Sequence, residues 1–198
     1  MSGPEPRTRV LLGLADNERE VDEADYLDAE FEEPYRYELV RGRLVVLSPN
    51  SEEHDDAAEP WRERLYAYKL AHRGVIQKIV PEAWVRISPK DFRIGDIGVY
   101  LTGDRSAQKR PVRVPEIMIE VLSPGQDSHD RDLVEKRDEY HAIGVLEYLI
   151  VDRLARRVIA LVREPAGYAE RILTEADTYT TPLLPGLSIL LVDVLAEG

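Results

Sequence analysis

Two carboxylates stand where the sequence otherwise predicts apolar strands. Glu120 lies inside the apolar run IMIEVL, and Asp96 opens the short run DIGVYL. Burying a carboxylate in a central strand costs free energy unless the group is paired or binds a cation. Each residue also has an ordinary structural interpretation. Glu120 could face solvent or an arginine at a strand end, and Asp96 could cap a turn.

We expect these two carboxylates to share one face of an antiparallel strand pair. If Asp96 lies roughly opposite Leu122, Glu120 is its diagonal neighbour, because positions two apart on a strand share a face. The separation is then about 7–8 Å at most. Carboxylates this close repel unless a cation lies between them, and oxygen ligands suit Mg²⁺ or Mn²⁺.

Lys136 is a third charged residue in an unusual place. A helix is predicted from Asp132 to Ile143, and Lys136 falls on the face of that helix expected to point inward. Its stem could cover apolar surface while the ammonium reaches solvent. Alternatively, the ammonium points toward the carboxylates, where it could orient an attacking water or stabilise charge on a phosphate. Asp132 precedes Lys136 by four residues and could position it, or could be a carboxylate favoured by the helix dipole.

The surrounding elements predict a mixed α/β (α+β) domain with a central sheet. Two β-rich runs around Arg41-Gly42 indicate a hairpin, and Gly144 fits a helix C-cap. Pro60 lies inside the long helix expected from Glu53 to Ala71, where it would kink the helix or mark a later start. The expected strands are a pair within Ile76–Ser88 broken near Pro81, then Asp96–Leu101, Glu116–Leu122, Leu146–Val151, and a hairpin of Val158–Val162 with Tyr168–Leu173.

Charge is distributed unevenly along the 198 residues, whose net charge is −12. Residues 16–33 hold ten acids and one arginine, so the other 180 residues carry only −3. We therefore expect an acidic N-terminal arm or helix over residues 1–34, followed by the main domain over residues 35–198. Two later segments, Asp104–Arg113 and Arg153–Arg163, are basic.

Composition excludes several classes of protein. The absence of cysteine rules out disulfides, thiolate zinc sites and cysteine nucleophiles. We find no apolar run of about 18 residues and no secretory signal, so no membrane partner is expected and the cytoplasm is the expected compartment. Phosphate-loop, dinucleotide, serine-hydrolase and zinc-protease motifs are also missing.

Six segments in order resemble one family: YELVRGRLVVLSP, EEH opening a helix, GDI, IEVLSP, RDLVEKRDEY and GVLEYLIVD. Together they are similar to the Uma-two family of restriction-endonuclease-like proteins, a bacterial branch of the PD-(D/E)xK nuclease superfamily. The resemblance runs from Tyr37 to Leu187. It implies acidic metal ligands at Asp96 and Glu120 and a lysine at Lys136, which the family carries on the helix after the strand. Gly95 replaces the usual proline.

This resemblance implies a metal-dependent phosphodiester hydrolase, an endonuclease with DNA as the expected substrate. Mg²⁺ or Mn²⁺ would be the cofactor, the Val121 carbonyl would be a further metal contact, and a homodimer is expected by analogy. Glu38 could add a third metal contact, or it could be an exposed strand residue opposite an arginine. His54 could contact phosphate or assist proton transfer, or it could be a helix-start residue hydrogen-bonded to the loop. Tyr140 is expected to pack, with its hydroxyl near Lys136 as a second interpretation.

Two rival functions stay open. One is a catalytically silent module on the same fold that binds nucleic acid or protein, which the charge of −3 outside residues 16–33 favours slightly. The other is a hydrolase of a small phosphate ester. A closed pocket of roughly a few hundred Å³ would favour the small substrate, and a wide basic groove would favour the nuclease.

Overall fold

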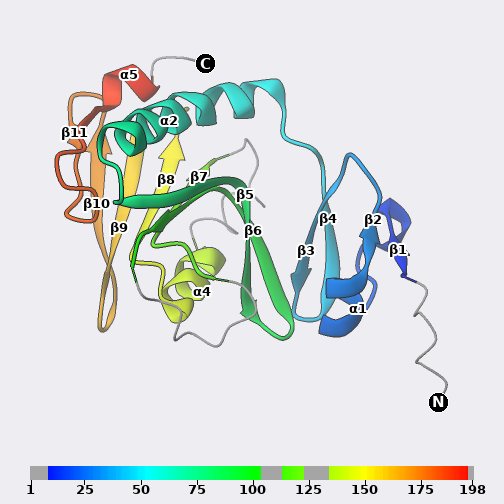
Figure 1. The fold of residues 1–198 in the computed structure, drawn as a ribbon. Helices are drawn as coiled ribbons and strands as arrows, with labels where there is room; N and C mark the ends of the chain where they lie inside the picture. The colour runs from blue at the N-terminus through cyan, green and yellow to red at the C-terminus, as the bar shows by residue number, and fades with distance from the viewer. Residues whose placement is uncertain (1–8, 104–112, 123–133, 196–198) are drawn as a thin grey trace. The chain divides into compact units, whose positions relative to one another are not determined.

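A central sheet with strands buried along their whole length, flanked by a few helices, organises the structure. The computed structural model describes residues 9–103, 113–122 and 134–195 (Figure 1). The chain divides into two units, one of Met1–Pro49 with Arg86–Ile94 and one of Asn50–Val85 with Gly95–Gly198. The boundary expected at residue 35 stays a prediction.

The first unit contains the acidic segment and the first hairpin. Strands β3 (Arg36–Val40) and β4 (Arg43–Leu47) pair antiparallel, as predicted. Their turn places Arg41 at φ 54° and Gly42 at φ 78°, the left-handed conformations of a tight hairpin turn. The predicted acidic helix is α1 (Glu23–Asp28), whose N-cap Asp22 accepts a hydrogen bond from the Asp25 amide. The remaining short elements are β1 (Leu11–Leu12), β2 (Glu30–Phe31) and η1 (Leu14–Asp16).

The second unit is organised by a mixed sheet. Its strands are ordered β10-β9-β8-β7-β6, and β5 also pairs with β6. β7 and β8 run parallel, whereas β6–β7, β8–β9 and β9–β10 are antiparallel. All residues of β7 are buried, which confirms the predicted central strand. The bounds are β5 (Ile76–Ser88), β6 (Asp91–Leu101), β7 (Ile117–Val121), β8 (Glu147–Asp152), β9 (Arg157–Glu164) and β10 (Gly167–Thr174).

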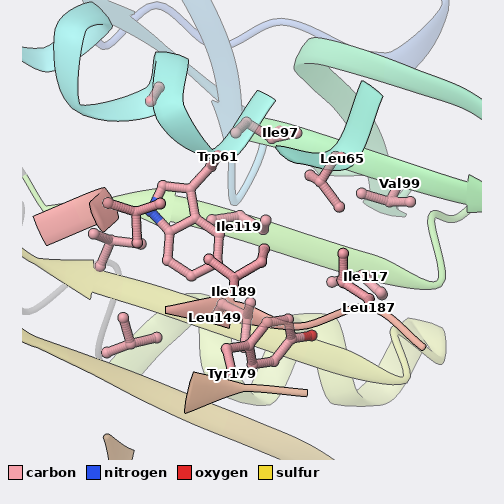
Figure 2. Packing of buried hydrophobic residues seen from close by; sticks show 14 of the residues in the cluster. Trp61, Leu65, Ile97, Val99, Ile117, Ile119, Leu149, Tyr179, Leu187 and Ile189 are labelled. Atoms are coloured by element: carbon pink, nitrogen blue, oxygen red, sulfur yellow. The ribbon is translucent and has the colours of Figure 1, made fainter. Parts of the chain in front are cut away.

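One face of this sheet packs against α2 (Glu52–Ala71). The indole of Trp61 lies over apolar side chains of the sheet, including Ile119 and Leu149 (Figure 2). Short β11 (Thr178–Tyr179), β12 (Ile189–Leu190) and α5 (Leu191–Leu195) add Tyr179 and other residues to this core. The helix α4 (Lys136–Ile143) lies on the other face, because Glu120, which it contacts, alternates with the core residues Ile119 and Val121.

The structure corrects two details of the predicted elements. Ile76–Ser88 is one strand rather than a broken pair. The strand continues past Pro81, which has no N–H to donate, and Glu82 next to it takes a left-handed conformation with φ 47°. This local irregularity does not interrupt β5. Pro60 does not mark a later start of the long helix, which begins at Glu52 and runs through it. Among the described residues, no helix is long and apolar enough to cross a membrane.

Candidate active site

The register of β6 and β7 brings Asp96 and Glu120 together. The ladder pairs Val99 with Ile117, Gly98 with Met118 and Ile97 with Ile119. The ladder ends at Ile97 and Ile119; beyond it the Val121 amide donates to Oδ2 of Asp96, which places Asp96 beside the residue that follows Glu120. The register assumed from the sequence, with Asp96 opposite Leu122, was wrong by two positions. A shared face of Asp96 and Glu120 stays a prediction.

Asp96 is held by two hydrogen bonds to the same carboxylate oxygen. The Val121 amide lies 2.7 Å from Oδ2, and Nε2 of His54 lies 3.1 Å from it. An ionised carboxylate only accepts hydrogen bonds, so the Nε2 of His54 carries the proton. Burial by itself raises the pKa of Asp96, but the hydrogen bond and charge of His54, the Val121 amide and the charge of Lys136 outweigh it. The pKa of Asp96 therefore lies below its usual value.

The position of His54 beside Asp96 depends on where α2 begins, and Ser51 caps that start. The Ser51 side chain accepts from the His54 amide, which makes Ser51 the N-cap and places His54 in the first helical turn. His54 is buried despite lying at a helix start. The structure thus joins His54 to the pair of carboxylates.

Glu120 is buried against two donors from α4. The Nζ of Lys136 and the hydroxyl of Tyr140 each lie 2.9 Å from Oε1 of Glu120. The two donors are one turn apart on the same helix face. Lys136 is only 2% exposed, so its ammonium does not extend to solvent. The hydroxyl of Tyr140 contacts the carboxylate directly, which neither interpretation of its role from the sequence included.

Glu38 lies in the first unit, whereas Asp96 and Glu120 lie in the second. Its carboxylate accepts from Nη1 of Arg93 at 3.1 Å and from the Ile94 amide at 2.9 Å. Both side chains are essentially inaccessible to solvent. These contacts give Glu38 a role in holding the start of β6, and a metal contact from Glu38 stays a prediction. Asp132 and the basic loop residues 104–112 lie outside the described residues.

Gly95 has a local steric reason that the sequence did not reveal. A Cβ built on Gly95 would collide with the thioether of Met118 and would lie 3.1 Å from Oε1 of Glu120. Met118 is fully buried and lies two residues before Glu120 on the same face of β7. The residue before Asp96 is therefore small because Met118 occupies the neighbouring space.

The side chains of this site that could bind a divalent metal are two carboxylates. Asp96 and Glu120 supply oxygen donors, the type that Mg²⁺ and Mn²⁺ prefer. The described ranges contain no group of three or more His, Cys, Asp or Glu residues arranged to hold a metal. Mg²⁺ commonly takes one or two carboxylates and completes its shell with water and substrate phosphate oxygens. The two carboxylates therefore fit a Mg²⁺ site of this sparse kind.

The structure is an α+β protein in which the buried acids Asp96 and Glu120 lie on neighbouring strands and the buried Lys136 contacts Glu120. Residues 23–194 match the model of the Uma2 family, described as "Putative restriction endonuclease". The chain therefore belongs to the Uma2 family, in agreement with the resemblance found in its sequence.

A solved structure shares the fold. A "putative nuclease belonging to DUF820" from Anabaena variabilis ATCC 29413 superposes with a TM-score of 0.71 at 13% identity. The match covers 89% of this chain and 98% of that one. At this identity the likeness establishes the fold alone. No curated protein matches the sequence.

Proposed function

We propose that this protein is a divalent-metal-dependent phosphodiester hydrolase that cleaves nucleic acid, with DNA as its substrate. The observation that carries the proposal is the buried pair Asp96 and Glu120 on facing strands, with Nζ of Lys136 2.9 Å from Glu120. Burial of opposed acids in a sheet is costly for folding alone. Membership in a family described as restriction endonucleases supplies the reaction class.

In the proposed reaction, Asp96, Glu120 and the Val121 carbonyl hold Mg²⁺ or Mn²⁺. The bound metal would polarise a phosphate oxygen and lower the pKa of a coordinated water. Lys136 keeps Glu120 oriented and directs the attacking water by hydrogen bonding. Water attacks phosphorus in line, the bond to the 3′-oxygen breaks, and solvent water protonates that oxygen.

His54 and Tyr140 act as positioning residues in this proposal. Each donates to one of the two carboxylates, His54 to Asp96 and Tyr140 to Glu120. The hydrogen bonds to Oδ2 of Asp96 and Oε1 of Glu120 restrict the rotation of the two carboxylates. This restriction lowers the entropic cost of assembling a reactive geometry. His54 also stabilises the ionised form of Asp96, the form that binds a cation.

The test is titration calorimetry with Mn²⁺ and Mg²⁺ on wild type and on the Asp96→Ala/Glu120→Ala double variant. We expect saturable binding to wild type that the double variant loses while its circular dichroism spectrum stays native. Cleavage of labelled DNA, with RNA as the comparison, should require the metal and fail in Lys136→Ala. If wild type binds neither ion at millimolar concentration, with or without DNA, the proposal is wrong.

A catalytically silent binding module is the second candidate. The first turn of α2 carries exposed Glu52, Glu53 and Asp55 beside His54, and such acids repel a phosphate backbone. Absence of metal-dependent cleavage, with or without binding of DNA, would support this candidate. Dimerisation of either form is proposed from the superfamily, and light scattering on the full chain would measure it.

A further inference from the structure

We infer that Arg153 binds a phosphate group of the nucleic-acid backbone next to the Asp96–Glu120 pair. The inference rests on the proposed function and deepens it, because it names the side chain that receives the substrate.

The first argument is the place of Arg153 in the sheet. Val121 pairs with Val151 in the parallel β7–β8 ladder, and the Leu122 amide donates to the Val151 carbonyl at 2.9 Å. The carboxyl ends of parallel strands meet at one edge of a sheet. Arg153 follows Asp152, the last residue of β8, so it leaves the sheet at the edge where β7 presents Glu120 and Val121.

The second argument is the contact that Arg153 makes with α2. Its Nη1 donates to the Glu53 carbonyl, 100 residues earlier in the chain. The residue after Glu53 is His54, which contacts Asp96. The guanidinium is therefore anchored one residue away from a side chain of the candidate site.

The third argument is that the other arginines of this turn are already engaged by carboxylates. Arg157 donates to Asp152, and Arg156 forms an ion pair with Glu175. Among the described residues, Arg153 instead donates its hydrogen bond to the uncharged carbonyl of Glu53. A guanidinium has further N–H donors in a planar fork that matches phosphate. Arg153, whose charge also acts on the exposed Glu53 carboxylate, thus retains N–H donors for a ligand.

The fourth argument concerns the shape of the turn and its charge. Buried Asp152 accepts from the Ala155 amide and from Nε of Arg157, both at 3.0 Å, which braces the chain on either side of Arg153. The exposed acids in the first turn of α2 oppose a phosphate, and Arg153 places a cation directly against that turn. A phosphate beside the carboxylate pair would need such a cation.

The experiment measures binding of a fluorescent DNA duplex by anisotropy, with Ca²⁺ replacing Mg²⁺, over about 50–200 mM KCl. Arg153→Gln keeps an N–H donor for the Glu53 carbonyl but removes the charge. Arg156→Gln is the matched control, because it removes an exposed arginine from the same turn. Mn²⁺ affinity and thermal stability are measured on both variants.

For Arg153→Gln we expect about five- to tenfold weaker binding and a salt slope reduced by about one, across different sequences. Arg156→Gln should change neither the DNA affinity nor its dependence on salt. Both variants should bind Mn²⁺ with the affinity of wild type. The inference is overturned if the two variants behave alike, or if Arg153→Gln binds DNA like wild type. It is also overturned if Arg153→Gln loses Mn²⁺ affinity in parallel with DNA affinity, since that indicates a structural role. Metal-dependent cleavage by the same wild-type protein would keep the proposed function intact in each of these cases.

Discussion

Lys136 and Glu120 form a buried ion pair in which Nζ lies 2.9 Å from Oε1, with each side chain 3% exposed. The lysine comes from α4 and the glutamate from the centre of β7. Their charges therefore compensate each other at a position where neither would be stable alone. The pair links the stability of the fold to the candidate site.

Replacing Lys136 by methionine should destabilise the protein by about 3–5 kcal/mol, because Glu120 would remain buried without its ammonium partner. Urea unfolding measures the change. Arg137→Met is the control, since its pair with Glu170 is partly exposed and should contribute no more than about 1 kcal/mol. Adding Glu120→Gln to Lys136→Met should recover part of the loss. Equal destabilisation by the two single variants would contradict this account.

Replacing Gly95 by alanine should cost about 1–3 kcal/mol, because the new Cβ meets the Met118 thioether in a filled core. Gly103→Ala is the control, since a Cβ there meets nothing within 4 Å and its φ is unstrained. The double variant Gly95→Ala/Met118→Ala should cost less than the sum of its single changes. Strictly additive free energies of unfolding would show that the two residues do not compete for space.

Replacing Tyr179 by phenylalanine should cost about 1–3 kcal/mol, because it removes a hydrogen bond to a buried carboxylate. Glu147 accepts from the Tyr179 hydroxyl at 2.6 Å and from Thr181 Oγ1 at 2.5 Å. Tyr66→Phe should change stability by less than about 0.5 kcal/mol, since Tyr66 is exposed and its hydroxyl contact is 3.5 Å long. Thermal unfolding measures both changes, and an equal loss of stability in Tyr179→Phe and Tyr66→Phe would contradict the prediction.

Stability at acid pH should depend on Glu23. The hydrogen bond from Arg86, together with its charge, lowers the pKa of Glu23 below its usual 4.5. The folded state therefore binds this proton less tightly than the unfolded state, so the contribution is present above pH 4.5 and is lost as pH falls through the lower folded pKa. Glu23→Gln should unfold with a shallower dependence on pH below 4.5. A melting temperature that falls equally steeply in both proteins would exclude this linkage.

Local patterns in the sequence were sufficient for most elements of the fold. Arg41-Gly42 predicted a hairpin because its turn needs left-handed conformations, and the helix expected from Glu53 to Ala71 is found from Glu52 to Ala71. The apolar run around Glu120 predicted a strand with both faces covered. The family resemblance placed Asp96, Glu120 and Lys136 in one site, and the structure brings these three together.

Side-chain alternation with a period of two residues predicted a shared face for Asp96 and Glu120, but it could not determine the register, since a shift by two residues keeps the same faces. Only the tertiary structure decided that the Val121 amide binds Asp96, that Met118 requires glycine at position 95, and that Arg153 reaches Glu53. These are contacts between segments far apart in the chain, and the packing of the whole core selects them.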